Sequence, residues 1–499
     1  MYTIRQAPGY DHHRFTANNS QLPPRRRRLT AMVTEARPIR GLRSKRARRL
    51  SIPEFGPYMF FGMHAPLAIL MWQVPIIASI HAGIVFVTGL FLAVSRRSPA
   101  YMAGIACYIA GSEVMWRLSQ APGLPWEFAE YSITVLLSIY LIWNGRLRKG
   151  MLPLAYIALL TPAAIYTLFG VSGSRAHAFL AFDMSGPIAL AVCCWFFYNV
   201  RLTRASLLRA LRCLIAPTLG LATILVVNLA TSTHIDFGKA SNFAASAGYG
   251  PNEVSGAMGL GVTVAFMYAL QDVRQLSIRV VLFTCSIGMA ALSAITFSRT
   301  GLYLSALSIT SGVVFMANGF RNMLKVVLVG AVAVGVSVFI VLPILDSFTQ
   351  GALVKRFEQS GVTHRDVLAL DDVNTFLQHP LFGVGVGLST KEHFRSQRGA
   401  AEESHTEPTR DLAEHGLLGV SALIILLVIT VRNIRSANGV ENRSLTVAWL
   451  VWAWLYMCVS AMRTVAPGVL FGLSCAAVLP NEPAPAATDD LVTAAALEA

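Results

Sequence analysis

Two polar stretches in the second half of the sequence hold side chains suited to chemistry on an anionic substrate. Arg299 lies in FSRTG, between two apolar runs, and SHTEPTRDLAEHGLLG brings His405, Glu407 and Arg410 within six positions of one another. A guanidinium binds phosphate oxygens in a bidentate fork, and a histidine near a carboxylate can take a proton from an attacking hydroxyl. We therefore predict that Arg299, with Arg365 or Arg410, binds an anion, and that His405, oriented by Glu407, acts as a base.

Each of these side chains also has a simpler interpretation. An isolated arginine at the end of a membrane helix usually extends toward lipid head groups, and a lone histidine in a loop is usually solvated. The prediction therefore depends on the combination of residues. Ser298 and Thr300 flank Arg299 at a tight reversal before Gly301, where hydroxyl and guanidinium donors can converge on one anion.

An earlier acid and base pair is a further candidate for substrate binding. Glu113 and Arg117 in GSEVMWRLS are four residues apart, so they share one face of a helix. A charge at membrane depth is costly unless it is paired or solvated. The pair either stabilises the fold or contacts a substrate, and the sequence favours neither interpretation.

Two other motifs are interpreted as local structure. Asp371 and Asp372 precede a helical stretch, where side chains of this type cap the first turn. The glycines at 383, 385 and 387 in HPLFGVGVGLS lack the strand, helix and downstream acidic residue that frame a dinucleotide site. We expect a turn at this segment.

The elements that position these residues must be membrane helices. Of the 499 residues, 54% are hydrophobic and 13% are charged, whereas roughly a quarter are charged in soluble domains. This composition excludes an ordinary soluble enzyme. Apolar runs occur at 57–94, 100–117, 127–144, 151–169, 178–199, 213–230, 253–270, 280–298, 301–318, 326–345, 414–431, 445–462 and 464–480. A span needs about 20 residues, so the first run is long enough for two helices.

The basic residues decide how the helices are oriented. Thirteen of the 41 lysines and arginines precede residue 53, and this tail faces the same side as the short basic loops only if the first run forms two helices. We predict an all-α, polytopic integral membrane protein with about 14 transmembrane helices, one large extracytoplasmic loop and both termini cytoplasmic. The predicted parts are a basic disordered tail at 1–56, transmembrane helices at 57–345, the loop with short helices at 346–413, further transmembrane helices at 414–480 and a disordered tail at 481–499.

The net charge of +15 does not predict nucleic-acid binding. The dense basic stretch at 25–49 of the basic tail has no interleaved aromatic residues, and the tail fits a topology signal or contact with anionic membrane lipids. The seven cysteines lie in or beside apolar runs and form no CxxC pair. They predict neither a disulfide framework nor a zinc site, and we expect no metal and no cofactor.

The order of these motifs resembles that of the O-antigen ligase and O-antigen polymerase superfamily of bacterial polysaccharide-assembly proteins. FSRTG resembles the family's Ser-Arg turn, HPLFGVGVGLS its NPLFGVG segment, and SHTEPTRDLAEHGLLG its segment HN…LAEYGLLG before a membrane helix. With GYGPNEVSGAMGL, GSEVMWRL and FDMSGP, the likeness extends over roughly residues 100–460. His379, Thr406 and Pro408 depart from the family pattern, and Pro408 removes a backbone donor beside His405.

The resemblance implies an inverting, metal-independent glycosyltransferase of the bacterial inner membrane. Its donor would be a glycan linked through pyrophosphate to a polyprenyl lipid, and its acceptor a glycan, the lipid A core or a protein. Such a reaction needs cations at the leaving group and a base at the nucleophile. These are the roles predicted for Arg299 with Arg365 or Arg410, and for His405. A chain-length regulator is a further candidate partner.

Two questions about the function remain open: which activity of the superfamily the chain has, and whether it is an enzyme or a transporter. The same donor serves a ligase, which transfers a finished chain, and a polymerase, which adds repeat units; the number of spans and the segments GSEVMWRL and FDMSGP slightly favour the polymerase. The alternative is a transporter or flippase of lipid-linked oligosaccharide. Such proteins are usually built from two related halves, and the single late polar loop argues against this alternative.

Overall fold

The computed structural model describes residues 55–95, 97–147, 150–232, 235, 237, 241–271, 276–317, 323–324, 328, 335, 337–358, 365–396 and 403–479. Both predicted tails lie outside these residues, except for Phe55 and Gly56, which begin the first helix. Nine of the twenty residues of the apolar run at 326–345 also lie outside them. Everything below concerns the described residues.

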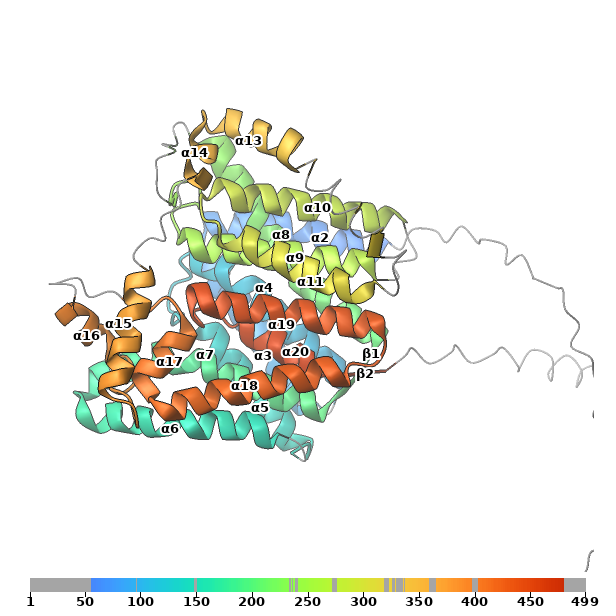
Figure 1. Cartoon of the computed structure of the whole chain (residues 1–499). Helices are drawn as coiled ribbons and strands as arrows, with labels where there is room; N and C mark the ends of the chain where they lie inside the picture. The colour runs from blue at the N-terminus through green and yellow to red at the C-terminus, as the bar shows by residue number, and fades with distance from the viewer. Residues whose placement is uncertain are drawn as a thin grey trace, which may run out of the picture. The chain divides into compact units, whose positions relative to one another are not determined.

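The chain is almost entirely helical (Figure 1). The first half contains α2 (Phe55–Gln73), α3 (Pro75–Val94), α4 (Pro99–Leu118), α5 (Phe128–Trp143), α6 (Met151–Gly170), α7 (Gly173–Asn199), β1 (Arg201–Thr203) and α8 (Arg204–Thr231). The second half contains α9 (Pro251–Leu270), α10 (Leu276–Ile295), α11 (Thr300–Met316), the π-helical η1 (Ser337–Val341), α13 (Leu342–Phe348), α14 (Ala352–Glu358), α15 (Arg365–Gln378), α16 (Ser389–Ser396), α17 (Glu407–His415), α18 (Leu417–Ser436), α19 (Val440–Ser460), α20 (Ala466–Cys475) and β2 (Ala477–Leu479).

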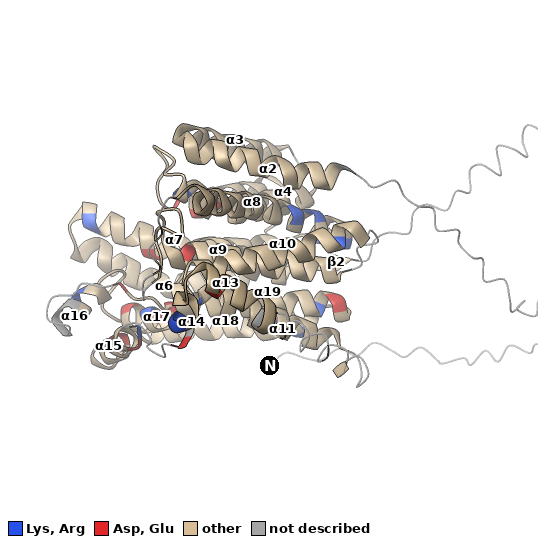
Figure 2. Cartoon of the chain, turned by 90° about the horizontal axis from the view of Figure 1, so that it is seen from above, with Lys and Arg blue, Asp and Glu red and all other residues tan. Residues whose placement is uncertain are grey.

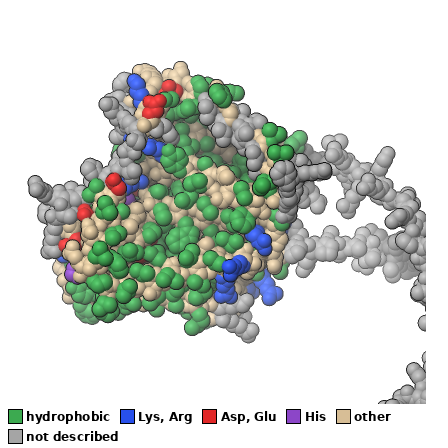
Figure 3. Space-filling view, in the orientation of Figure 1, with side chains coloured by type: hydrophobic (Ala, Val, Ile, Leu, Met, Phe, Trp, Pro, Cys, Tyr) green, Lys and Arg blue, Asp and Glu red, His purple; other side chains and the backbone are tan. Residues whose placement is uncertain are grey.

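Large apolar side chains face outward on the long helices. On α3, Ile76, Ile80, Ile84, Val87 and Phe91 are each more than half exposed, while small residues such as Ala78, Ala82 and Gly89 form the buried face. Hydrophobic side chains cover the middle of the face seen in Figure 3, and charged ones lie near its left and right margins. Exposed apolar surface of this extent requires a lipid environment.

The first apolar run forms two helices, α2 and α3, as the charge pattern predicts. Val74 leaves the helical conformation, with φ of −129° and ψ of 84°, and Pro75 begins the next helix at a position that needs no backbone N–H. Near the start of α2, Tyr58 donates a hydrogen bond to Ser277 of α10. Near the end of α3, the Ala93 carbonyl accepts one from Asn144.

The long helices have two distinct ends. β1 and β2 pair in parallel at one end, with Arg201 opposite Ala477, and the ion pair between Arg204 and Glu441 closes the same end. α15, α16 and α17 lie at the other end (Figure 1). Figure 2 shows that charged residues gather toward these two ends. We call them the β end and the α17 end.

Seven of the described helices are long and apolar enough to span a membrane by length and composition: α3, α6, α7, α8, α9, α10 and α18. Shorter or more polar helices occupy the other predicted runs. The predicted count of fourteen spans is therefore not confirmed, although the all-α membrane fold is. Short helices, α14 to α17, occupy the described parts of the predicted loop at 346–413.

Candidate active site

The FSRTG turn is held against α9 by one serine. Ser255 Oγ donates to the Ser298 carbonyl at 3.0 Å and accepts from the Gly301 N–H at 3.0 Å. A Cβ on Gly301 would collide with the Ser255 carbonyl, so only glycine permits this close approach. Phe297 has a φ of 59°, a conformation that persists only where the surroundings impose it. The turn thereby places Arg299 at the start of α11, at the α17 end.

A second arginine joins Arg299 from α14. Arg299 Nη2 donates to the Arg356 carbonyl at 3.1 Å, and Arg356 Nε donates to the Phe297 carbonyl at 3.3 Å. Burial and the neighbouring Arg299 lower the pKa of Arg356. Sequence reasoning missed Arg356 because nothing local distinguishes it from the other basic residues of its segment.

Two more arginines surround His405. Arg365 Nη1 donates to the Val459 carbonyl at 3.1 Å, and the His405 carbonyl accepts from the Ala461 N–H at 3.0 Å. Burial, then Arg463 and then Arg365, lower the pKa of His405 to about 4. Burial and then Arg463 lower the pKa of Arg365; Glu253 opposes this by raising it, and Arg356 adds a smaller lowering effect.

Arg463 and Arg365 lie near His405, Arg356 lies near Arg365, and Arg299 contacts the Arg356 backbone; we call these four arginines the cation cluster. Residues from α11, α14, α15, the segment before α17 and the turn before α20 meet there. Four guanidinium groups with partly removed solvent form a strong site for an anion. The structure thus brings together three of the predicted residues, Arg299, Arg365 and His405.

Arg463 occupies a turn that repeats the geometry of FSRTG. Ala461 has a φ of 50° two residues before Arg463, as Phe297 does two residues before Arg299, and a threonine follows each arginine. Each turn precedes a short apolar helix, α20 or α11. The recurrence of Arg-Thr after an apolar run was the available sequence signal for Arg463, which the prediction did not use.

Glu407 and Arg410 belong to a separate buried network. Arg410 Nη2 lies 2.6 Å and 2.7 Å from the two carboxylate oxygens of Glu407, and Arg410 also pairs with Asp183 of α7. Glu407 Oε2 accepts in addition from the Met462 N–H at 3.1 Å. In this structure Glu407 makes no hydrogen bond to the His405 ring, because its carboxylate faces Arg410 one turn along α17. It fixes α17 beside the Arg463 turn instead.

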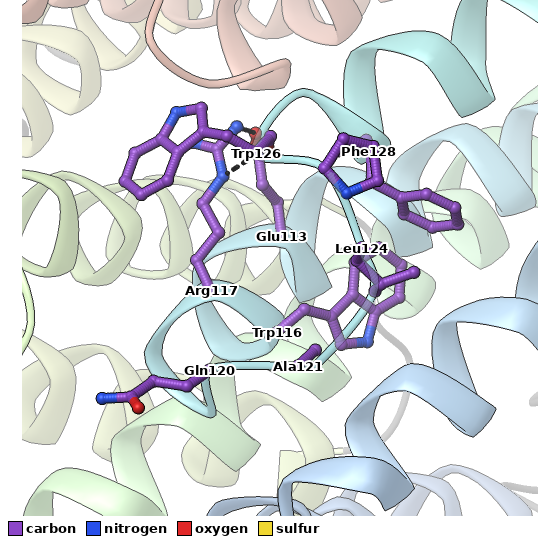
Figure 4. Close-up of a pocket in the computed structure, with 10 residues that line it drawn as sticks. Glu113, Trp116, Arg117, Gln120, Ala121, Leu124, Trp126 and Phe128 are labelled. Atoms are coloured by element: carbon purple, nitrogen blue, oxygen red, sulfur yellow. Dashed lines mark hydrogen bonds and ion pairs between the residues drawn. The ribbon is translucent and has the colours of Figure 1, made fainter.

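The predicted pair of Glu113 and Arg117 forms, with an Oε1–Nη2 distance of 2.6 Å. Arg117 also lies 3.2 Å from Glu130 and stacks 4.5 Å from the Trp126 ring centroid. Its Nη1 donates to the Arg463 carbonyl at 2.6 Å. The pair lines a cavity of about 280 Å³ (Figure 4). Through the hydrogen bond from Arg117, it also holds the backbone of Arg463 in place.

The described part of the polar segment at 346–413 is folded around two other acidic residues, Glu414 and Asp372. Gly383, Gly385 and Gly387 adopt φ of 68°, 99° and 71°, and the Gly387 N–H donates to Glu414 at 2.9 Å. The predicted turn is thus confirmed. The predicted N-cap role of Asp371 and Asp372 is wrong, because α15 begins earlier, at Arg365.

Asp372 instead ties three segments together. It accepts from His393 Nε2 at 2.9 Å, from Ser404 Oγ at 2.9 Å and from Thr409 Oγ1 at 2.7 Å. Aspartate, and not histidine, is central, so the group lacks the hydroxyl-to-histidine contact of a nucleophilic triad. It holds the chain on both sides of His405 in place.

Two further cavities adjoin the cation cluster. An apolar groove of about 530 Å³ is lined by α10, α11, η1, α13 and α14, including Leu302, Leu345, Leu353 and Val354. A polar cavity of about 460 Å³ is lined by α7, the turn at 387–390, residues 403–404 and α17. The described lining residues of the two cavities come from different helices. No group of three or more metal-ligating side chains occurs among the described residues.

Residues 280–424 match the family model described as O-antigen ligase. The match supports assignment of this segment to the O-antigen ligase and polymerase superfamily. The segment includes Arg299, Arg356, Arg365 and His405, and the match confirms the resemblance of its motifs. Members are glycosyltransferase-like enzymes of polysaccharide biosynthesis that act generally on lipid-linked glycans. No curated protein matches the chain.

Proposed function

We propose that this chain transfers a glycan from a polyprenyl-pyrophosphate carrier at the α17 end, and that this end faces away from the cytoplasm. One observation carries the proposal: Arg299 and Arg356, two members of the cation cluster, lie on or next to the helices that line an apolar groove. Leu302 lines the groove three residues after Arg299, and Leu353 and Val354 line it on the helix that bears Arg356. A polyprenyl pyrophosphate has the same two parts, an anionic group and a long apolar chain.

The cation cluster has the charge that the leaving group requires. In the proposed reaction an acceptor hydroxyl attacks the anomeric carbon, the bond from that carbon to the pyrophosphate oxygen breaks, and the electron pair leaves with the lipid pyrophosphate. Guanidinium donors fixed where negative charge develops lower the barrier to this step. The reaction inverts the anomeric configuration because the hydroxyl attacks opposite the leaving group.

His405 takes the proton of the acceptor hydroxyl in this proposal. Its pKa of about 4 keeps the ring neutral near pH 7, so it is free to accept a proton. A bound pyrophosphate would offset the positive charges of Arg463 and Arg365 and raise the pKa of His405. Donor binding would therefore make His405 a stronger base. Arg410, Glu407, Glu113 and Arg117 position this site through buried ion pairs.

We propose polymerisation of repeat units in O-antigen or exopolysaccharide synthesis, with ligation of a finished chain as the second candidate. Both use the same donor and the same cluster. The family match gives no support to the transporter or flippase alternative.

The test compares neighbouring cations on α14. A deletion strain is complemented with wild type, Arg356→Ala or Lys355→Ala, and its surface and lipid-linked glycans are resolved by length. Because Lys355 is exposed, its variant should restore wild-type glycans. Arg356→Ala should lower transfer by about 10²–10³-fold, as loss of one preorganised donor does.

The accumulated species distinguishes the two activities. Single repeat units on the lipid indicate a polymerase, whereas full-length chains on the lipid indicate a ligase. Immunoblots of membranes establish that the variants are present in equal amounts. Full complementation by Arg356→Ala, or unchanged glycans in the deletion strain, would overturn the proposal.

A further inference from the structure

Arg463 of the cation cluster contacts two residues that line the polar cavity. Arg463 Nη2 lies 3.3 Å from Glu403, and its guanidinium carbon lies 5.8 Å from the Phe182 ring centroid. Both residues line the cavity. The same arginine lowers the pKa of His405, and Ser404, which also lines the cavity, precedes His405 in the chain. The cavity therefore adjoins the proposed base.

The polar cavity has a volume of about 460 Å³, which lies within the range of small-molecule sites, roughly 300–1,000 Å³. Phe179 and Phe182 provide apolar ring surface, while Ser389, Thr390 and Ser404 provide hydroxyl groups. A sugar ring offers the matching groups, with hydroxyls at its edge and C–H bonds on its faces. Aromatic faces with a few placed polar groups are typical of a site that orients such a ligand.

The charged groups of the lining indicate which sugars can enter. The acidic residues Glu127, Asp183, Glu403 and Glu414 line the cavity together with His177, and Arg410 is the one lysine or arginine among its described lining residues. Arg410 is already bound by Asp183 and Glu407. Arg463, beside the cavity, is likewise paired with Glu403. A phosphate or carboxylate on the ligand would thus meet carboxylates whose neighbouring cations are already paired, which is unfavourable.

We propose that this cavity binds the acceptor through a sugar end that carries no phosphate or carboxylate, and presents one of its hydroxyls to His405. The inference rests on the proposed function and deepens it by naming the acceptor class. The donor would approach from the apolar groove and the acceptor from the polar cavity, so the two substrates meet at Arg463 and His405.

The test measures acceptor binding without donor. Purified protein in detergent is titrated with a neutral oligosaccharide, one repeat unit released from the lipid carrier of the same cells, or with the same oligosaccharide bearing a terminal phosphate. Saturation-transfer NMR reports binding. The neutral probe should bind at least tenfold more tightly than the phosphorylated one.

Two variants and a control test the location. Ala181→Trp should fill the cavity and weaken neutral-probe binding at least tenfold, whereas Ser174→Trp, at an exposed position on α7 outside the lining, should leave it unchanged. Glu127→Lys should lower the ratio of neutral-probe affinity to phosphorylated-probe affinity, or bring it below one. Binding of polyprenyl pyrophosphate should stay at the wild-type value in all three variants.

The outcomes separate this inference from the proposed function. Unchanged neutral-probe binding in Ala181→Trp, or equal binding of both probes by wild type, would overturn the acceptor assignment even where transfer from the lipid donor proceeds. If Arg356→Ala complements the deletion fully while the neutral probe still binds normally, the proposed function alone is overturned.

Discussion

At the scale of single residues, Arg463 connects the parts of the proposed site. Its side chain contacts Glu403 of the polar cavity, and its carbonyl accepts from Arg117. Its positive charge lowers the pKa of His405, next in effect to burial. One residue thereby joins the buried ion pair of Arg117 with the proposed base.

Replacing Arg463 with Gln should raise the pKa of His405 toward its usual value of about 6.5. A base acts only when unprotonated, so in wild type the acid limb of the kcat/KM profile should lie near pH 4. In Arg463→Gln the limb should move to higher pH, and activity at pH 5 should fall more than activity at pH 8. His405→Ala should remove the limb and lower transfer by about 10²–10⁴-fold. An acid limb that stays in place in Arg463→Gln would assign the proton to another group.

The candidate site was only partly predictable from the sequence, for a physical reason. Arg299 and His405 are recognisable because each belongs to a motif at the end of an apolar run. Arg356 joins them only through tertiary packing, and with 41 lysines and arginines in the chain no local pattern selects it. Arg463 repeats the Arg-Thr pair of Arg299, but only tertiary packing brings the two turns to the same site. Spacing placed His405, Glu407 and Arg410 in one segment, but it did not predict that Glu407 pairs with Arg410 instead of His405, or that Asp183 and Met462 complete this network.

At the scale of elements, a chain of hydrogen bonds joins α2, α3 and α4. Trp116 Nε1 donates to His81 Nδ1 at 2.9 Å, so the neutral His81 ring carries its proton on Nε2 and donates to Tyr108 at 2.9 Å. The Tyr108 hydroxyl then donates to His64 Nε2 at 3.0 Å, and His64 Nδ1 donates to the Phe60 carbonyl at 2.7 Å. Every donor in this chain has an acceptor, which suits a membrane interior.

Tyr108→Phe should weaken the packing of these three helices. It removes the central hydroxyl and leaves two buried histidine nitrogens without their partner, at a cost of about 2 kcal/mol. Thermal unfolding in detergent should show a midpoint lower by roughly 2–4 °C. Tyr101→Phe on the same helix is the matched control, because Tyr101 is exposed, and it should leave the midpoint unchanged. Equal midpoints for both variants would contradict a stabilising role.

At the scale of the whole molecule, the membrane fold follows from composition more directly than the site does. Apolar runs predict where helices form because a backbone in lipid must satisfy its own hydrogen bonds. They predict the break at Val74 only with the help of loop charge. They do not predict how α14 to α17 fold, because those helices are held by specific contacts such as those of Asp372 and Glu414 and not by a repeating pattern.

The two ends of the helices should face opposite sides of the membrane, with the α17 end outside. Basic residues near Asn438, namely Arg432, Arg435 and Arg443, favour a cytoplasmic β end. Ser174 lies near the start of α7, at the α17 end. A membrane-impermeant maleimide applied to intact spheroplasts should therefore label Ser174→Cys, and should label Asn438→Cys only after permeabilisation. Wild type controls for the native cysteines, of which Cys458 is exposed along α19. The reverse labelling pattern would place the cation cluster in the cytoplasm, where a carrier glycan awaiting assembly outside the cell could not reach it.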